Sequence, residues 1–357
     1  MIKNEILFIA QYPENISPGQ RFRFELYKEL LAENGYKITT RSFLDVNGYQ
    51  VIHKNGLFFA KVVAVLKGYL KRIGQLFTIG KFNYIFLQRE AALLGPPVFE
   101  WLYIKVFNKK VIYDFDDAIW IPHISDNNSL FINLKSVNKV QSICKWAYKV
   151  SAGNEYLCDY ARKYNSNVIY NPTCVDTEKR HNIICNHNVD KITIGWTGSF
   201  STLIYLYMVV PVLQKLQEKY DFNIKIICNQ QPLLNLKNVH FVEWTPESEV
   251  AELATCQIGL MPLSNDEWSE GKCGFKLVQY LALEIPAVSS FVGVNKVIIE
   301  HGVNGFLCTS EDEWYTNIET ILKNTELRKK MGKAGREKVV KSYSLLSNKR
   351  QFLDLFS

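Results

Sequence analysis

Short apolar runs, each about as long as a β-strand, alternate with helix-like segments along almost the whole sequence. Strands of parallel sheets are covered by helices on both faces, so they read as continuous apolar runs. The pattern therefore predicts parallel sheets layered between helices. We place the strands near residues 6–10, 37–43, 84–88, 110–116, 149–152 and 168–170 in the first half, and near 192–197, 224–228, 239–242, 258–262, 287–290 and 305–307 in the second.

A polar stretch at residues 179–190 separates the two series of strands and lacks clear periodicity. The chain has 357 residues, which is long enough for two domains. We predict an α/β fold of two doubly wound, Rossmann-like domains, residues 1–178 and 191–343, joined by a linker at 179–190. Ligands of such sheets bind beyond the carboxyl ends of the strands, so two facing domains would form a cleft between those ends.

The composition excludes several classes of protein. Hydrophobic residues make up 47% and charged residues 22%, as in ordinary globular proteins, and 13% aromatic residues argue against disorder. The eight cysteines form no C-x-x-C pair, which predicts reduced thiols in a cytoplasmic protein and no structural zinc. The amino terminus is interrupted by charge and soon meets Pro13, so it predicts a strand and not a signal peptide. No apolar run reaches the roughly 18 residues of a membrane-spanning helix.

Positive charge is concentrated in the first half of the chain. Residues 1–180 hold 24 Lys and Arg against 16 Asp and Glu, and residues 57–77 combine apolar residues with Lys61, Lys67, Lys71 and Arg72 and contain no acid. A basic amphipathic helix of this kind can lie on an anionic membrane, or it can pack one face on its own domain. The basic residues are not interleaved with aromatics, and no helix-turn-helix or zinc finger is evident, so nucleic acid is not an expected partner.

The segment from Gly271 to Phe306 predicts a loop, a helix, a strand and a second loop. Apolar residues recur at helical spacing from Gly274 onward, and Lys272 and Lys276 lie at and just inside the start of that helix. Helix N-termini carry unsatisfied N–H groups, so an anion there would be stabilised by the backbone and by both ammonium groups. Gly293 falls in a turn where backbone could approach a ligand. The alternative is an ordinary βα unit with solvated lysines.

Polar residues also follow the strands of the first half. Asp114, Asp116 and Asp117 lie at the end of the strand at 110–116, and carboxylates so close together raise one another's pKa. The loop after the first strand carries Arg21 and Arg23, which flank Phe22 and would point in different directions in a helix. The alternative is structural: the arginines form a salt-bridged helix start, and the acids cap a loop or pair with Arg21 or Arg89.

Five segments together resemble the GT-B glycosyltransferases of the family 4 type, in particular bacterial enzymes of capsule, lipopolysaccharide and exopolysaccharide assembly. They are residues 111–120, 151–157, 170–176, 194–199 and 272–306. The resemblance spans nearly the whole chain. It implies a nucleoside-diphosphate sugar held mainly by the second domain, an acceptor held by the first, and a C-terminal helix at 344–357 that packs back on the first domain.

The resemblance also implies roles for individual residues, although this chain departs from the common pattern. Gln279 stands where many relatives have a glutamate that contacts the donor ribose, and Glu270 lies one position away from the expected first acid. The loop at 196–202 lacks the usual arginine and lysine, so Lys272 and Lys276 are the expected cations for the diphosphate. The implied donor site comprises Gly19, Arg21, Gly198, Ser199, Glu243, Trp244, Lys272, Gly274, Phe275, Lys276, Gln279 and Gly293. The expected catalytic residues are Asp116, Asp117, Lys272 and Lys276, with Arg23, Gln88, Arg89 and Asp114 on the acceptor side.

The residues and the resemblance together predict a glycosyltransferase, in the hexosyl and glycosyl transfer class, that moves a sugar to a hydroxyl of a glycan or lipid-linked glycan in bacterial surface polysaccharide synthesis. The resemblance implies that the transfer retains the anomeric configuration. We expect no cofactor and no metal, although Asp114 and Asp116 match the D-x-D pattern by which the unrelated GT-A enzymes hold a divalent ion. We expect a cytoplasmic protein, with peripheral contact to the inner membrane face left open. Alternatives are a nucleotide-sugar epimerase of the same fold and a non-catalytic glycan-binding protein. A nicotinamide dehydrogenase is disfavoured because no G-x-G-x-x-G follows the first strand.

Overall fold

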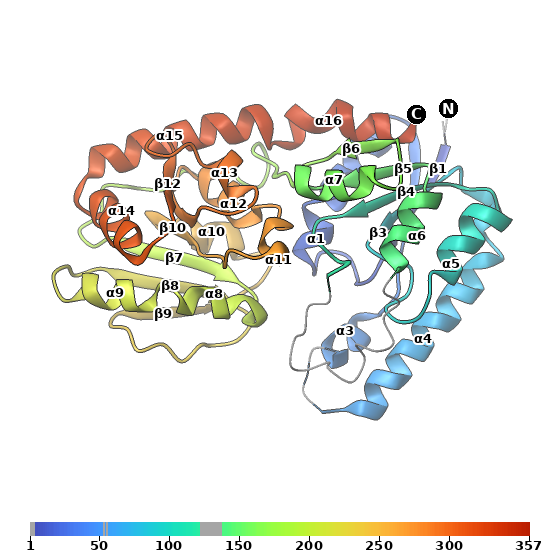
Figure 1. Ribbon diagram of the computed structural model, residues 1–357, viewed down its shortest axis with the longest axis horizontal. Coiled ribbons are helices and arrows are strands. Elements are labelled where there is room, and N and C mark those ends of the chain that lie inside the picture. The colour runs from blue at the N-terminus through green and yellow to red at the C-terminus, as the bar shows by residue number, and fades with distance from the viewer. Residues whose placement is uncertain (1–3, 53, 55, 122–137) are drawn as a thin grey trace. The chain divides into compact units, whose positions relative to one another are not determined.

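The computed structural model describes residues 4–52, 54, 56–121 and 138–357 (Figure 1). The chain forms two compact units, residues 1–172 with 349–357 and residues 173–348. Each unit contains one six-stranded sheet in which all neighbouring strands run parallel. The twelve strands coincide, within a few residues, with the twelve apolar runs predicted as strands.

The sheet of the first unit has the strand order β2-β1-β3-β4-β5-β6. Its strands are β1 (Asn4–Ala10), β2 (Tyr36–Ser42), β3 (Tyr84–Gln88), β4 (Lys110–Phe115), β5 (Lys149–Ala152) and β6 (Val168–Tyr170). The connecting helices are α1 (Pro18–Arg21), α2 (Lys28–Glu33), α3 (Val46–Ile52), α4 (Phe58–Leu76), α5 (Val98–Trp101), α6 (Lys139–Trp146) and α7 (Glu155–Arg162), with shorter turns η1 (Glu25–Tyr27), η2 (Ile79–Lys81) and η3 (Leu102–Val106).

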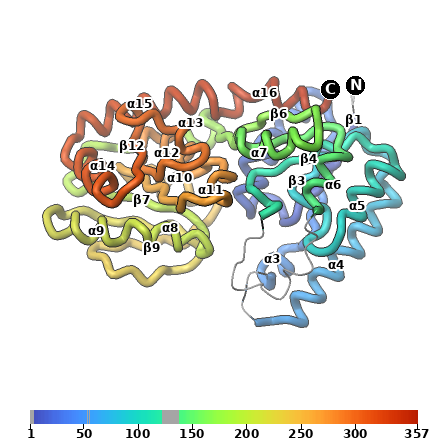
Figure 2. The backbone as a smooth tube through the Cα atoms, in the orientation of Figure 1, coloured from blue at the N-terminus to red at the C-terminus, as the bar shows by residue number. Residues whose placement is uncertain are grey.

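The C-terminal residues complete the core of the first unit. They form α16 (Leu345–Leu353) and η6 (Asp354–Phe356), which bring the end of the chain to this unit (Figure 2). Phe352 stacks on Tyr27 with ring centroids 3.9 Å apart, and Phe356 lies edge-on to Phe8 at 6.3 Å. The last nine residues therefore belong to the first unit, and Phe352, Leu355 and Phe356 are buried in its hydrophobic core.

The sheet of the second unit has the order β12-β11-β10-β7-β8-β9. Its strands are β7 (Thr193–Gly198), β8 (Asn223–Cys228), β9 (Val239–Glu243), β10 (Ile258–Met261), β11 (Ala287–Ser290) and β12 (Gly305–Cys308). Its helices are α8 (Leu203–Tyr207), α9 (Val210–Gln217), α10 (Glu249–Leu253), α11 (Glu267–Glu270), α12 (Phe275–Ala282), α13 (Asn295–Ile298), α14 (Glu311–Lys323) and α15 (Thr325–Ser342), with the short turn η5 (Phe200–Thr202).

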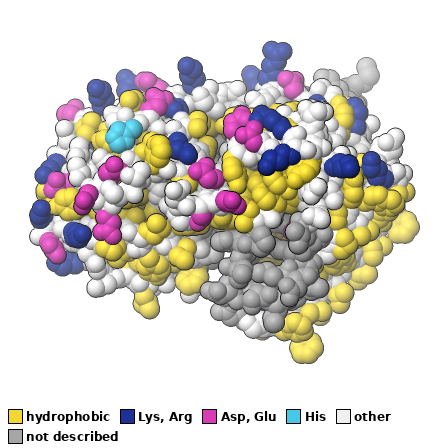
Figure 3. Space-filling view, viewed as in Figure 1, with side chains coloured by type: hydrophobic (Ala, Val, Ile, Leu, Met, Phe, Trp, Pro, Cys, Tyr) yellow, Lys and Arg dark blue, Asp and Glu magenta, His cyan; other side chains and the backbone are white. Residues whose placement is uncertain are grey.

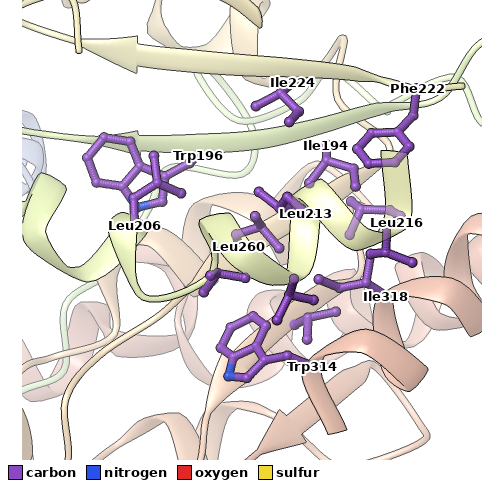
Figure 4. Close-up of a cluster of buried hydrophobic side chains, with 14 of the residues drawn as sticks. Ile194, Trp196, Leu206, Leu213, Leu216, Phe222, Ile224, Leu260, Trp314 and Ile318 are labelled. Atoms are coloured by element: carbon purple, nitrogen blue, oxygen red, sulfur yellow. The ribbon is translucent and has the colours of Figure 1, made fainter. Parts of the chain in front are cut away.

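Alternate residues of β7 face opposite layers of the second unit. Ile194 and Trp196 join the hydrophobic cluster formed with α8, α9 and α14 (Figure 4), whereas Gly195 lies against Cys256, just after α10. This period of two is what a strand covered on both faces requires. The predicted linker at 179–190 belongs to the same unit. Cys185 N donates to Leu283 O at 2.9 Å, so the end of α12 satisfies the backbone of this polar stretch.

Helix α4 is amphipathic, as predicted from its sequence, but its orientation is unusual. Lys61, Arg72 and Gln75 are buried, while most of its large apolar side chains are exposed. The helix thus packs one face on its own domain, as one of the two alternatives had it, and the packed face is the polar one. The polar face is buried because the Arg72 guanidinium donates to backbone carbonyls there. No helix within the described residues is long and apolar enough to cross a membrane.

Candidate functional site

Both sheets have a point where the strand order changes direction, and parallel sheets bind ligands at the carboxyl edge of that point. In the second unit the change lies between β7 and β10, and in the first it lies between β1 and β3. Gly198 and Gln88 are the last residues of β7 and β3, and Ser199 and Arg89 follow them directly. The start of α1 and the segment before α12 follow β1 and β10. Most of the predicted site residues therefore lie at one of two positions that the topology favours for ligands.

In the second unit, Lys276 and the end of β7 are brought together. The Lys276 Nζ atom lies over the Trp196 ring, 4.9 Å from its centroid, and the Lys272 Nζ atom lies 4.7 Å from the Trp268 centroid. Such cation–π contacts hold an ammonium group without neutralising its charge. Each lysine therefore lies against an aromatic ring, Lys276 against Trp196 and Lys272 against Trp268, and keeps its positive charge there.

The electrostatic state of Lys276 follows from its surroundings. Burial, and next the positive charge of Lys272, lower the pKa of Lys276 to about 7. The protonated form of Lys276 is therefore disfavoured when no anion lies beside it. An anion placed beside it would supply the missing counter-charge and raise the pKa again, so the group is suited to hold a diphosphate.

Glycines shape the loops around these lysines. A side chain at Gly198 would lie 2.7 Å from both Thr202 Oγ1 and the Trp196 ring, so the loop after β7 requires glycine there. Gly274, directly before α12, has a φ of 65°, and Gly293 has a φ of 51°. A side chain at Gly293 would lie 3.0 Å from Ser269 O. The close approach made by Gly293 is thus to the chain's own backbone. Ser199, which follows Gly198, is exposed, and its hydroxyl lies 2.9 Å from the Ser201 hydroxyl.

Gln279 is completely buried, and neither its amide oxygen nor its amide nitrogen has a hydrogen-bond partner in the described structure. The Ser289 hydroxyl and the Trp196 indole N–H are in the same condition. A buried polar group without a partner costs about 1–3 kcal/mol, so such groups normally contact a ligand or a water molecule. This condition is consistent with a ligand contact at Gln279. Phe275 is only half-buried at the start of the same helix.

Glu243 and Trp244 lie at the far edge of the second sheet. In the sheet register Gly198 pairs with Cys228, and Cys228 pairs with Glu243, so the three residues form one row at the carboxyl edge. The Trp244 indole donates to Glu249 Oε1 at 3.0 Å. This row runs along the carboxyl edge of the sheet from Gly198 to Glu243, both of which belong to the implied donor site.

In the first unit, Arg89 gathers the two later acids. Its Nε donates to Asp116 Oδ1 at 2.9 Å, and its Nη2 pairs with Asp117. Arg89 also has a left-handed backbone with a φ of 60°, which is uncommon outside glycine. Burial raises the pKa of Asp116, Arg89 opposes the rise and Asp117 adds to it, with a net pKa above the ordinary value. This pairing agrees with the alternative prediction that the acids have a structural role and pair with Arg89.

The start of α1 contacts the same group. A side chain at Gly19 would lie 2.6 Å from Asp116 Oδ2, so glycine allows the carboxylate to approach the helix start. Gln88 Nε2 donates to Gly19 O at 3.4 Å. Arg21 is buried, with its guanidinium carbon 4.8 Å from the centroid of the Phe22 ring. Gly19, Gln88, Arg89, Asp116 and Asp117 therefore form one polar cluster.

Arg23 and Asp114 adjoin that cluster, since the Arg89 backbone N–H donates to Asp114 O at 2.7 Å, but their side chains bind each other. Their side chains are fully buried and paired with each other, with Arg23 Nε 3.2 Å from Asp114 Oδ2. Ser151 Oγ donates to Asp114 Oδ1 at 2.6 Å, and Asn171 O accepts from Arg23. A closed network of this kind holds β4 and β5 to the start of the chain, and it offers the acceptor no exposed group.

The two acids of the D-x-D pattern bind different arginines: Asp114 binds Arg23, and Asp116 binds Arg89. Within the described ranges no group of three or more His, Cys, Asp and Glu side chains is arranged to hold a metal ion. Sequence reasoning also missed Trp196 and Trp268 as partners of the lysines. Trp196 could have been identified from its position two residues before Gly198 on the predicted strand. No sequence feature pointed to Trp268.

Residues 221–338 match the family of group 1 glycosyl transferases. The matched segment lies within the second unit. The matched segment includes Lys272, Lys276 and Gln279, and it confirms the predicted enzyme class, a glycosyltransferase. No curated protein matches the sequence.

Several solved structures are similar over nearly the whole chain. Sucrose-phosphate synthase from Thermosynechococcus elongatus is 13% identical with a TM-score of 0.74, covering 99% of this chain and 98% of that one. Anabaena HepE in complex with UDP and glucose is 15% identical with a TM-score of 0.67, covering 98% of each chain. A glycosyltransferase from Rickettsia africae is 12% identical with a TM-score of 0.69, covering 99% of this chain and 98% of that one. At these identities the similarity shows the fold, and it confirms the GT-B class with two Rossmann-like domains.

Proposed function

We propose that this glycosyltransferase uses a nucleoside-diphosphate sugar and holds its diphosphate between Lys276, Lys272 and the loop at Gly198 and Ser199. The observation that carries the proposal is Lys276, which lies over Trp196 at the carboxyl edge of the second sheet with a pKa lowered to about 7. The buried, unpartnered amide of Gln279 would accept and donate hydrogen bonds to the donor ribose. One protein of similar fold has been solved with UDP and glucose bound. The donor itself is the only small molecule the proposal requires, with no cofactor or metal.

Binding of the donor is tested by thermal denaturation with UDP, GDP, ADP and their sugars. A ligand at 100 times its Kd stabilises the folded protein by about 2.7 kcal/mol, which is readily seen as a rise in Tm. We expect one base series to stabilise the protein and the others to do so less. If none of them raises the Tm, the donor assignment is wrong.

We propose that transfer retains the anomeric configuration. The acceptor hydroxyl would attack the anomeric carbon on the face from which the diphosphate leaves, and a phosphate oxygen would receive the hydroxyl proton. The main work of the protein is then to stabilise charge on the leaving diphosphate. The cluster of Arg89, Asp116 and Asp117 in the first unit would contact the acceptor or the sugar. Proton NMR of the first-formed product distinguishes retention from inversion.

We further propose a glycan or lipid-linked glycan acceptor and a role in bacterial surface polysaccharide synthesis at the inner face of the membrane. Support comes from the similar fold of a lipopolysaccharide outer core galactosyltransferase, which is 12% identical with a TM-score of 0.59 and covers 98% of each chain. The exposed apolar face of α4, with the exposed Lys67 and Lys71 beside it, provides separate support for a membrane site. Transfer of labelled sugar to extracted lipid-linked glycans would test the acceptor, and failure with every lipid-linked glycan would contradict it.

Donor affinity should depend on pH through Lys276. The free site has a Lys276 pKa of about 7, and the bound diphosphate raises it, so binding takes up a proton above that pH. Full affinity should therefore be present below about pH 7 and should fall about tenfold by about pH 8. Titration calorimetry in buffers of different ionisation enthalpy measures both effects. Lys276→Arg keeps its charge and should give a flat profile, whereas an unchanged slope in that variant would assign the dependence to another group.

A further inference from the structure

Helix α4 presents a continuous apolar stripe to the surroundings. The stripe consists of Phe59, Val63, Leu66, Leu70, Ile73 and Phe77, whose spacing of four and three residues keeps them on one helical face. Phe59 is 84% exposed, Leu66 57%, Leu70 68% and Phe77 86%. The hydrophobic side chains gather at the lower right of Figure 3, where Figure 1 places α4.

The contacts on the opposite, buried face of the helix keep this apolar stripe facing outward. Arg72 is completely buried and donates to Ala91 O at 2.6 Å, Ala10 O at 2.8 Å and Arg41 O at 3.1 Å. A rotation of α4 that buried the stripe would break these bonds and remove the acceptors of the buried Arg72 guanidinium. Gly68 also packs directly on the Phe43 ring. The exposure of the stripe is therefore built into the fold of this unit.

A second segment adds apolar surface beside α4. Tyr69 of α4 donates to Leu94 O at 2.6 Å and lies 6.0 Å from the Phe99 ring, which ties α4 to the α5 and η3 segment. Val98, Trp101 and Val106 of that segment are also exposed. Exposed apolar side chains that gather on neighbouring segments in this way are typical of a site of interaction with a partner or a membrane. Tryptophan is favoured where apolar and aqueous phases meet.

The positive charge of the same region indicates which kind of partner would bind the stripe. Residues 46–89 contain seven Lys and Arg and no Asp or Glu, an excess equal to the formal net charge of +7 of the whole chain. Lys67 and Lys71 are exposed on α4 beside the apolar stripe, with Lys71 only 3.9 Å from the exposed Asp45. A second copy of α4 would bring lysines together without an acid on either helix to pair with them. An anionic lipid surface, in contrast, can bind the apolar side chains and the lysines together.

We propose that α4 lies in the interface of an anionic lipid bilayer, with the apolar stripe among the acyl chains and Lys67 and Lys71 at the headgroups. The helix has 19 residues, about 28 Å of length, and would lie along the membrane plane. The inference rests on the membrane part of the proposed function and assigns it to a specific surface. It makes no claim about the donor site, so an experiment can contradict the lipid-binding proposal without contradicting the donor-binding proposal, and the reverse.

The experiment is sedimentation of the full chain with vesicles, without any nucleotide. Binding is compared between phosphatidylcholine vesicles and an equal mixture of phosphatidylcholine and phosphatidylglycerol. We expect binding to the anionic vesicles that weakens as salt is raised. The variant Leu66→Glu with Leu70→Glu should lower it at least tenfold, since each leucine contributes about tenfold when buried. The matched control, Leu233→Glu with Val340→Glu, alters two exposed apolar residues of the second unit and should bind normally.

A second variant tests the charge alone. Lys67→Gln with Lys71→Gln keeps the apolar stripe and should weaken binding to anionic vesicles roughly 30-fold, with little change for neutral ones. The Tm and its rise with nucleotide should be unchanged in each folded variant. The inference is overturned if the unmodified chain does not sediment with anionic vesicles, or if neither variant lowers its binding. It is also overturned if the chain dimerises without lipid through a contact that the leucine variant abolishes, because a second copy would then cover the stripe.

Discussion

Lys276→Ala should reduce turnover by about 100- to 1,000-fold while the free energy of unfolding stays within about 1 kcal/mol of its original value. The ammonium group stabilises charge that develops on the diphosphate as the glycosidic bond breaks. Its loss therefore raises the barrier to reaction. Folding is little affected, because burial disfavours the charged form of this lysine and no carboxylate contact ties it to the rest of the fold in the interactions the structure gives. Release of nucleoside diphosphate at saturating donor measures turnover, and chemical denaturation measures stability.

The control for this variant is Lys215→Ala. Lys215 is an exposed lysine of α9 that pairs with Glu311 at 3.6 Å, and its removal should change turnover less than about twofold. Lys276→Arg would separate charge from shape, because arginine keeps the charge but alters the donor geometry. Unimpaired turnover in Lys276→Ala would mean that another group holds the leaving diphosphate, and the site would have to be reassigned.

Asp114→Ala should lower the free energy of unfolding of the first unit by about 3–5 kcal/mol, because it leaves the Arg23 guanidinium buried without its counter-charge. Both side chains are completely buried, so solvent cannot compensate. Ser151 Oγ also loses its acceptor. Urea denaturation, followed by a probe in the first unit, measures the loss in a chain whose two units can unfold separately.

The exposed acid Asp159, which pairs with Arg162 at 2.7 Å, provides the comparison. Asp159→Ala should cost less than about 1 kcal/mol. Replacing both buried partners, Arg23→Met with Asp114→Leu, should recover much of the stability lost in Asp114→Ala, since apolar pairs of similar volume often replace buried ion pairs without penalty. A loss below about 1 kcal/mol in Asp114→Ala would show that the buried network contributes little to folding.

The strands could be predicted because each one is buried on both faces, so its apolar residues form an unbroken run. β1 is the clearest case: Ile6, Leu7, Phe8, Ile9 and Ala10 are all completely buried. The boundary between the units was placed at residue 178, whereas the first unit ends at Pro172. Polarity suggested a linker at 179–190, but hydrogen bonds to the end of α12 make it part of the second unit.

The separation of Asp114 from Asp116 could not be predicted. The two acids are two residues apart, and Arg23 reaches the first from 91 positions earlier in the sequence. Similarly, the pattern of α4 identifies a basic amphipathic helix but does not say which face is buried. The answer depends on carbonyls of β1 and β2, which no local sequence pattern reveals. Lys272 and Lys276 could be proposed from the sequence because their spacing relative to a helix start is local information.

The return of the last nine residues to the first unit has a consequence for synthesis of the chain. Phe352 and Phe356 fill the core beside Phe8 and Tyr27, yet they are made only after the entire second unit. At about 5–20 residues per second, the ribosome needs roughly 10–40 seconds to pass from residue 172 to the end. During that interval the nascent first unit exposes aromatic surface, so this enzyme should depend on chaperones while it is being translated and much less once it is released.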